Sequence, residues 1–333
     1  MRTLITIREP GGSPTPLVVE GDRFTDPGDG PVDHEIRTGQ LYALPGLADC
    51  HAHVGMESIG AGSSLSDDDI RANCIKNAWM QVEGGVLLIA DKGSPSDVSL
   101  EILDAPPQER PAMQMARRMI APHDGYAPDY RGEDDEAGLV DAFRASAAGP
   151  ASWVKIIGDW PRKGVGPQAN YGEAALRAAV EIAHAAGRRV AVHTMAPSGL
   201  RPAVDAGVDS IEHGLFLSED DLAKLAARRG AWVPTILGVE SIIRFLGSES
   251  SGGRLLARGI ENVRKLLPEA ERLGATVLAG TDLAVPHGKV ALEAIRLHEF
   301  GLSRPAALRA VTCAAYDYLG VEHEFSPGAV SYT

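Results

Sequence analysis

The pattern of hydrophobic and polar positions along the chain changes near residue 46. Before that point, short stretches alternate apolar with polar residues, and turns rich in Gly, Pro and Asp, such as Asp26–Gly30, separate them. This alternation predicts three strands, at Leu4–Ile7, Leu17–Val19 and Glu35–Arg37. Residues 1–46 are therefore expected to form a small β domain.

After residue 46, near-continuous apolar runs of strand length alternate with segments of helical periodicity. Runs that are apolar on both faces are typical of parallel strands buried between two layers. Eight strands are predicted, at Leu47–Val54, Gly85–Asp91, Ala116–Ala121, Ser152–Gly158, Arg189–Thr194, Val208–His213, Ala231–Ile236 and Ala275–Thr281. With helices between most of them, these strands predict an α/β fold, a (β/α)8 TIM-like barrel over residues 47–321.

Composition narrows the classes of function. The 333 residues are 44% hydrophobic and 23% charged, and their net charge is −13. Nucleic acid and anionic membranes bind basic surfaces, so neither is expected as a partner of this acidic chain. The expected partner is a small-molecule substrate. Whether the chain forms a homo-oligomer stays open. Three widely spaced cysteines argue against a disulfide framework and favour a cytoplasmic protein.

Six titratable residues stand in or at the ends of the predicted barrel strands. They are His51, His53, Lys155, His193, His213 and Asp282. The carboxyl ends of barrel strands meet at one rim, which is where active sites of such barrels form. Several imidazoles, a bridging anion and a carboxylate near a bound water are what a hydrolytic site with two metal ions needs.

Lys155 lies among apolar neighbours in Trp153–Ile157, so its ammonium group is expected to be buried, at a high cost in free energy. Three outcomes are open. The amine could be neutral, it could pair with a carboxylate such as Asp159, or it could react with CO2. The last outcome gives a carbamate, whose two oxygens can bridge two cations.

Asp282 follows the last predicted strand. A carboxylate at that position could bind a metal, take a proton from the attacking water and pass it to the leaving group. The alternative is an N-cap for the next helix, which Pro286 and Gly288 delay. Asp282 is therefore expected to be both a metal ligand and the catalytic acid–base group.

The segments around these residues resemble the amidohydrolase superfamily, in its imidazolonepropionase/prolidase-like branch. The matching segments are Leu44–His53, Val154–Ile156, Val190–His193, Ser210–Gly214, Ala279–Asp282, Pro286–Gly288 and Ala306–Thr312. The resemblance implies a first metal held by His51, His53 and Asp282. It implies a second metal held by His193 and His213, with carboxylated Lys155 bridging the two.

By this resemblance, the chain is a metal-dependent hydrolase with two divalent cations, zinc being the expected metal. A metal-bound hydroxide would cleave an amide-type C–N bond in a dipeptide, an N-acyl amino acid or a cyclic amide. A lactone or ester hydrolase is an alternative. A mononuclear deaminase is another, although Thr194–Ser198 lacks the Glu that such enzymes usually carry after the fifth-strand His. A catalytically inactive binding protein is less favoured, because no ligand is missing.

Four more residues follow strand ends and are expected to line the substrate pocket: His123, Tyr126, Arg162 and His287. Each could instead belong to ordinary loop structure. Two departures from the family leave the substrate open. The second strand ends in Ile89–Gly93, where relatives often have an Arg-Asp pair, and Thr194–Met195 follow His193, where relatives often have a second polar residue. Relatives usually continue beyond Pro327–Ala329 with a strand that completes a small β-sandwich, so residues 1–46 and 322–333 are expected to form an incomplete one.

Overall fold

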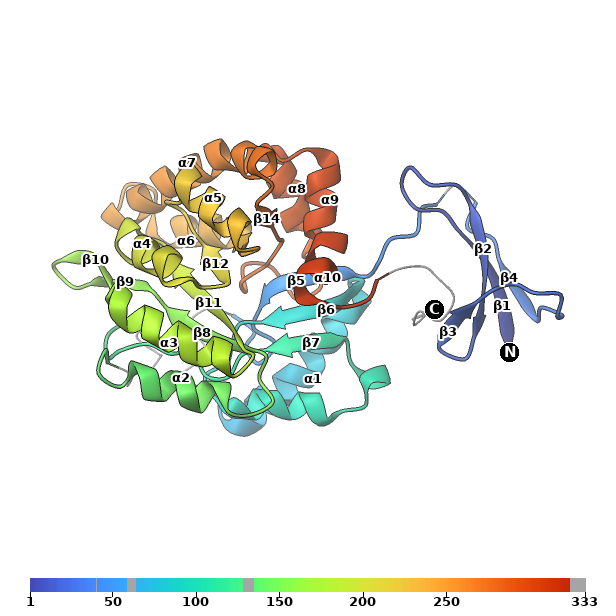
Figure 1. Cartoon of the computed structure of the whole chain (residues 1–333), viewed down its shortest axis with the longest axis horizontal. Coiled ribbons are helices and arrows are strands. Elements are labelled where there is room, and N and C mark those ends of the chain that lie inside the picture. Colours follow the sequence, from blue (N-terminus) through green and yellow to red (C-terminus); the bar gives the residue numbers. More distant parts are fainter. Residues whose placement is uncertain (40, 59–63, 128–134, 324–333) are drawn as a thin grey trace.

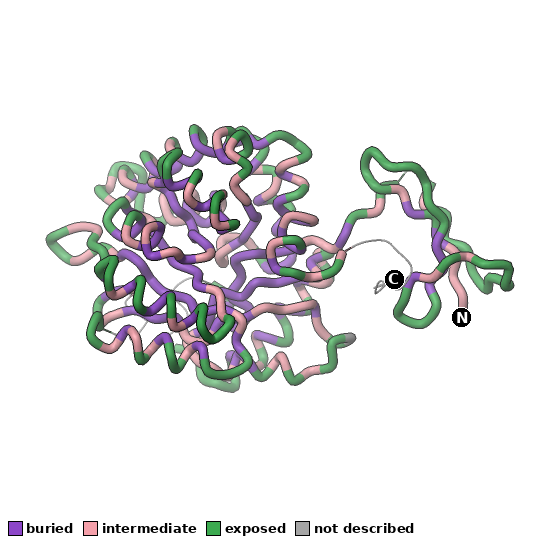
Figure 2. The backbone as a smooth tube through the Cα atoms, viewed as in Figure 1, coloured by how far each residue is buried: buried purple, intermediate pink, exposed green. Residues whose placement is uncertain are grey.

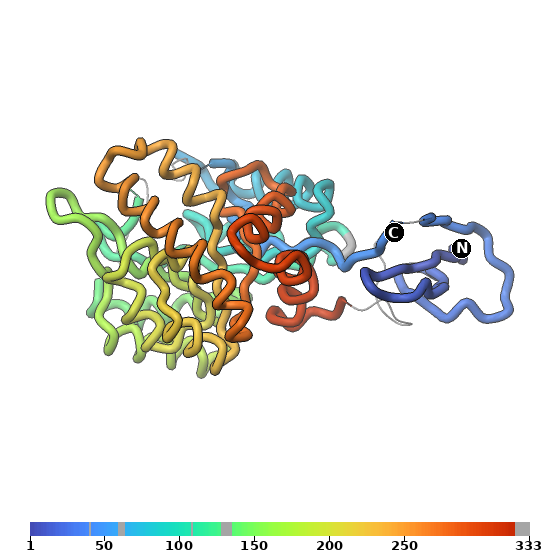
Figure 3. Tube along the Cα trace, turned by 90° about the horizontal axis from the view of Figure 1, so that it is seen from above, coloured from blue at the N-terminus to red at the C-terminus, as the bar shows by residue number. Residues whose placement is uncertain are grey.

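The structure is a computed structural model that describes residues 1–39, 41–58, 64–127 and 135–323. It has two parts. A small N-terminal sheet stands apart from a large α/β body, and the chain near residues 43–46 connects them (Figures 1 and 3). All six candidate metal ligands lie in the large body.

The small part is a four-stranded sheet in the order β3-β2-β1-β4. Its strands are β1 (Arg2–Ile7), β2 (Thr15–Glu20), β3 (Arg23–Thr25) and β4 (His34–Ile36). β2 pairs antiparallel with β1 and β3, while β4 pairs parallel with β1. The three predicted strands are present, and the three-residue β3 was not predicted. The predicted contribution of the C-terminal tail falls on residues 324–333, outside the described residues.

The large part contains eight parallel strands, in two sheets of order β5-β6-β7 and β14-β13-β12-β11-β8. Their bounds are β5 (Leu47–Ala52), β6 (Val86–Asp91), β7 (Ala112–Met115), β8 (Trp153–Ile157), β11 (Arg189–Thr194), β12 (Ser210–His213), β13 (Ala231–Val233) and β14 (Thr276–Val277). The position predicted for the third strand, Ala116–Ala121, is wrong. The seventh and eighth strands are shorter than predicted, because Ile236 begins a helix and the backbone after Val277 leaves the regular ladder.

Single contacts join the two sheets at both edges. On one side, Ala116 and Ile120 form isolated parallel bridges to Trp153 and Ile156 of β8. On the other side, the Cys50 N–H donates to the Ala279 carbonyl at 2.8 Å. The strands therefore follow one another in chain order, as in a TIM-like α/β fold.

Helices surround the strands, and Figure 2 shows the buried strands inside a shell of half-exposed helices. The helices are α1 (Asp67–Glu83), α2 (Leu139–Ala147), α3 (Glu173–Ala185), α4 (Pro197–Ala206), α5 (Glu219–Ala227), α6 (Ile236–Leu246), α7 (Ser251–Leu273), α8 (Ala291–Glu299), α9 (Arg304–Ala310) and α10 (Cys313–Leu319), with 3-10 turns at Asp97–Asp104 and Pro107–Glu109. Ser66 and Ser218 begin α1 and α5 with capping boxes. In the parts of the chain that the structure describes, no helix is both long and apolar enough to cross a membrane.

A hairpin that the sequence did not predict follows β8. Its strands are β9 (Asp159–Arg162) and β10 (Gly166–Ala169), paired antiparallel. In Figure 1 the hairpin projects from the large body at the end far from the N-terminal sheet. It carries Trp160, which lies beside the candidate site.

Alternation along the strands selects the residues that point inward. Ala90, Trp153 and Ala191 belong to one buried cluster enclosed by the strands. Side chains two positions apart on a strand share a face. Lys155 and His193, each two residues after a member of this cluster, therefore continue the inner face toward the carboxyl ends of the strands.

Candidate metal centre

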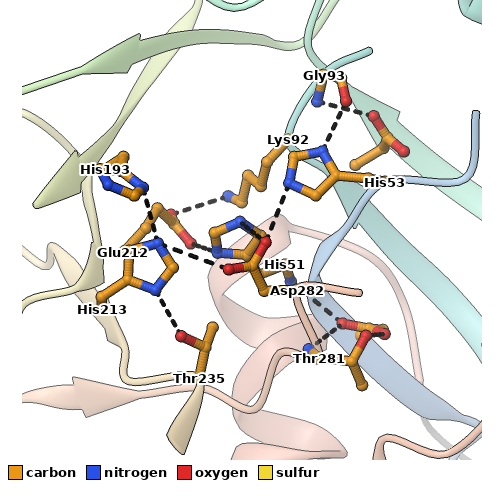
Figure 4. A network of polar contacts seen from close by, with 12 residues as sticks. His51, His53, Lys92, Gly93, His193, Glu212, His213, Thr235, Thr281 and Asp282 are labelled. Carbon is orange, nitrogen blue, oxygen red and sulfur yellow. Dashed lines mark hydrogen bonds and ion pairs between the residues drawn. The ribbon is translucent and has the colours of Figure 1, made fainter. Parts of the chain in front are cut away.

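His51 and His53, at the end of β5, form a compact group with Asp282, which lies in the loop after β14 (Figure 4). The Nε2 atoms of both histidines lie 3.4 Å from Oδ1 of Asp282. One ligand atom from each of the three residues lies within 4.8 Å of the others. The Nδ1 of His53 lies 2.7 Å from the Gly93 carbonyl oxygen, to which it donates, so the Nε2 lone pair is left for a cation.

His193 and His213 form a second group beside the first. The Nδ1 of His193 lies 2.9 Å from Nε2 of His213, and the latter lies 3.7 Å from Oδ2 of Asp282. Within the described chain, the buried Nε2 of His193 has no hydrogen-bond partner. Asp282 thus touches both groups, and the nitrogen and oxygen donors suit zinc.

Three site residues adopt backbone conformations that non-glycine residues rarely adopt. The φ angles are 64° at His213, 47° at Thr235 and 47° at Asp282. The turn at His213 lets Glu212 and His213, which are adjacent in sequence, both face the site. Such strain persists where the surrounding structure enforces it, and it is frequent at functional sites.

Lys155 is 2% exposed, and its amine has no hydrogen bond or ion pair with any described residue. The predicted alternative of a pair with Asp159 is not formed. Asp159 instead accepts hydrogen bonds from the backbone N–H groups of Met195 and Ala196. Burial lowers the pKa of Lys155 to about 8. A buried amine without a partner is the chemical setting in which a carbamate can form.

Burial and neighbouring charges set the ionisation of the other candidate ligands. Burial, then the positive charge of Lys155, lowers the pKa of His51 to about 4. Burial lowers the pKa of His213 to about 3 and that of His193 well below its usual value. Burial alone would raise the pKa of Asp282, but the surrounding histidines more than offset it. Neutral imidazoles and an ionised carboxylate are the forms that bind metals.

His53 differs from the other three imidazoles. Burial lowers its pKa, but the contact with Asp282 raises it by more, so the net shift is upward. The two groups therefore share a charge-assisted contact when no cation is bound. A cation would replace the additional proton on the His53 ring, because metal binding releases protons from the ligands.

Two buried charged residues, Lys92 and Glu212, also lie at the site, and the sequence had not identified them as site residues. Oε2 of Glu212 lies 2.7 Å from Nδ1 of His51, and Nζ of Lys92 lies 3.3 Å from Oε1 of Glu212 (Figure 4). The sequence carried a weaker signal for Glu212 than for Lys155, because its strand is Ser-Ile-Glu-His rather than an apolar run.

Two buried aspartates hold the loops of the site. Asp49 accepts hydrogen bonds from the Thr281 hydroxyl at 2.6 Å and from the Gln81 amide at 3.1 Å. Asp91 accepts from the backbone N–H groups of Val54 and Gly93 at 2.6 and 2.9 Å. These bonds tie the ends of β5, β6 and β14 together around the ligands.

His287 is 7% exposed and lines a cavity of about 360 Å³. The other residues that line the cavity are Glu57, Lys76, Asn77, Met80, Leu283, Ala284, Val285 and Pro286. Nε2 of His287 lies 3.0 Å from the Met56 carbonyl oxygen. The cavity is lined by the loop that follows Asp282, and none of the six candidate ligands lines it, so contact of His287 with substrate stays a prediction.

The other three predicted substrate residues lie in different settings. Tyr126 packs edge-on against Trp160 and His193, with ring centroids 4.9 and 5.5 Å apart. The Arg162 guanidinium donates to the Asp124 carbonyl and to Asn170. The His123 side chain is 88% exposed and lies next to Asp124. Tyr126 is thus the one of these three that touches a candidate ligand, and contact with substrate stays a prediction for all of them.

Comparison with known proteins places the chain in a family. Residues 42–326 match the Amidohydrolase family. An uncharacterized protein of Mycobacterium tuberculosis is 32% identical over 317 residues, which cover 91% of this chain and 80% of that protein. An imidazolonepropionase of Salinispora arenicola is 25% identical over 284 residues, 76% of this chain and 65% of that protein.

Solved structures share the fold. A Xaa-Pro dipeptidase with bound methionine has a TM-score of 0.80 at 21% identity, covering 99% of this chain and 92% of its own. The A. niger ochratoxinase has a TM-score of 0.76 at 20% identity, with coverages of 96% and 84%. Together with the sequence match over most of its length, these findings establish that the chain belongs to the amidohydrolase family.

Proposed function

We propose that the chain is a metal-dependent hydrolase that cleaves an amide-type C–N bond in a dipeptide, an N-acyl amino acid or a cyclic amide. Membership of the amidohydrolase family supports a hydrolase. The names of a dipeptidase and an imidazolonepropionase among similar proteins support a bond of the amide type. The observation that carries the proposal is the convergence of the His51, His53 and Asp282 ligand atoms within 4.8 Å.

The residues fit two divalent cations, and we propose zinc. His51, His53 and Asp282 would hold the first, and His193 and His213 the second. A carbamate on Lys155 would bridge them. We also infer that the eight strands close into a barrel around this site. When bound, such cations polarise a carbonyl and lower the pKa of the attacking water.

The protein supplies the proton transfers. Asp282 is ionised in its histidine-rich surroundings, so its carboxylate accepts a proton from the attacking water. It then delivers that proton to the departing nitrogen as the C–N bond breaks. Water adds to the acyl carbon, and the products are a carboxylic acid and an amine.

Purification without chelator, followed by elemental analysis and a substrate screen, tests the proposal. We expect close to two equivalents of metal per chain and hydrolysis of at least one dipeptide, N-acyl amino acid or cyclic amide. Chelation should abolish the activity and zinc should restore it. One equivalent with full deaminase activity would favour the mononuclear alternative, and turnover of lactones or esters alone would favour the ester hydrolase. If protein purified without chelator contained no metal, and added zinc gave no activity, the proposal would be contradicted.

The proposal extends to the kind of binding partner and to the location of the protein in the cell. The partner is a small molecule rather than nucleic acid or a membrane, in keeping with the net charge of −13. We also propose a cytoplasmic location, with which the three free cysteines agree.

A further inference from the structure

Two buried charges lie side by side next to the candidate ligands. The side chains of Lys92 and Glu212 are 1% and 0% exposed, with Nζ 3.3 Å from Oε1. The ammonium also lies 3.8 Å from the centre of the Trp153 ring, a favourable cation–π contact. Because burying two ions costs more than packing two apolar side chains of similar size, stability alone does not explain the pair.

The two oxygens of Glu212 have separate tasks. Oε1 faces Lys92 and accepts a hydrogen bond from the Ser210 hydroxyl at 2.6 Å. Oε2 lies 2.7 Å from Nδ1 of His51. Among the described residues, neither Oε2 nor that Nδ1 has a hydrogen-bond partner, so this ion-pair contact is the close polar contact that both atoms make. The carboxylate is therefore held on one side and directed at a single nitrogen of His51 on the other.

That contact decides which nitrogen of His51 can bind a cation. A ring whose Nδ1 proton faces Glu212 presents an unprotonated Nε2 on its opposite edge. This Nε2 is the atom that lies 3.4 Å from Asp282. The orientation of His51 and the position of its proton thus follow from one carboxylate.

We propose that Lys92 and Glu212 are positioning residues that fix His51 with Nε2 toward the metal, an inference that rests on the proposed function. Glu212 holds the ring and its Nδ1 proton. Lys92 holds Glu212 in place and balances its charge, so the carboxylate is not drawn away to bind the cation itself.

Zinc binding to metal-free protein, measured by competition with a chromophoric chelator, tests this proposal. Glu212→Gln keeps the shape of the side chain but not its charge. The double variant Lys92→Met with Glu212→Leu removes both charges, so no unpaired ion is left to unfold the protein. We expect both variants to bind zinc about 10- to 100-fold more weakly than the wild type. The double variant should keep a thermal midpoint near that of the wild type.

Asp159→Asn is the matched control. It also replaces a buried carboxyl group by an amide, but Asp159 contacts backbone N–H groups of Met195 and Ala196 and no candidate ligand. Its zinc affinity should equal that of the wild type. A folded double variant with wild-type affinity would overturn the proposal.

A second measurement needs no metal. In metal-free protein with ¹⁵N-labelled histidine, NMR should locate the His51 proton on Nδ1, and the double variant should lose this preference. An unchanged tautomer would count against the proposal as strongly as unchanged affinity. If wild-type protein binds no zinc although the NMR result holds, the proposed function fails while the positioning of His51 by Glu212 stands.

Discussion

Three imidazoles at the site are held through the same ring nitrogen by three different partners. Nδ1 of His53 faces the Gly93 carbonyl, and Nδ1 of His213 lies 2.6 Å from the Thr235 hydroxyl. Nδ1 of His51 faces Glu212. Each contact directs Nε2 toward Asp282, so the ligand set is preorganised before a cation arrives.

Lys155→Ala should lose most of the activity and part of the bound metal, because the bridging anion would be missing. A small carboxylic acid such as acetate should restore some activity by occupying the gap. Lys155→Arg should not help, since guanidinium stays cationic. Elemental analysis and hydrolysis rates measure both effects, and wild-type activity in Lys155→Ala would rule out the bridge.

Asp282→Asn should lower kcat by about 100-fold or more, the usual scale for an acid–base group, with a smaller change in KM. Some metal should remain on the histidines. Asp141→Asn, on the surface helix α2, is the control and should leave both constants unchanged. Normal turnover by Asp282→Asn would mean that another group moves the proton.

At the scale of elements, the β9–β10 hairpin forms one wall of the site. Trp160 lies 6.0 Å from the His193 ring and packs against Tyr126, so an apolar substrate group would find an aromatic surface there. Trp160→Ala should raise KM for N-acyl amino acids with apolar side chains by up to about 10-fold, as expected for one aromatic contact. Polar analogues should change less. Val165→Ala, at the exposed tip of the same hairpin, should behave as wild type.

The start of the same hairpin carries a pH-dependent contribution to stability. Burial raises the pKa of Asp159 from 3.8 to about 7, so the folded protein keeps this proton to higher pH than the unfolded chain does. The contribution is therefore complete below about pH 4 and is lost as the pH rises through about 7. Relative to Asp159→Asn, the wild type should lose free energy of unfolding over this range. Urea unfolding at several pH values measures the difference, and parallel curves would contradict the assignment.

At the scale of the whole molecule, the N-terminal sheet has its own small core. Ile5, Ile7, Leu17, Val19 and Phe24 form a cluster separate from the clusters of the large body. Phe24→Ala should destabilise this sheet by about 3–5 kcal/mol while the metal site stays intact. Calorimetry should then show an earlier transition for the sheet and an unchanged one for the large body. A shift of both together would show that the two parts unfold as one unit.

The sequence by itself determined which strands carry chemistry and in what order. Apolar runs are local properties, so they place Lys155 inside a buried strand without knowledge of the fold. The same local pattern located seven of the eight large-body strands and placed His193 and His213 at the ends of two of them.

Only the tertiary structure determined the position of β7 and the role of Glu212, because the residues that contact them are far away in the sequence. The Gln114 amide of β7 donates to the Leu319 carbonyl at 2.7 Å, a partner 205 residues further along the chain, and so distant a contact leaves no local pattern that fixes where the strand begins and ends. Glu212 faces the site because of the backbone turn at His213, and there it contacts His51 on β5 and Lys92 after β6. A pattern along one strand cannot show that residues from three separate strands will meet around one carboxylate.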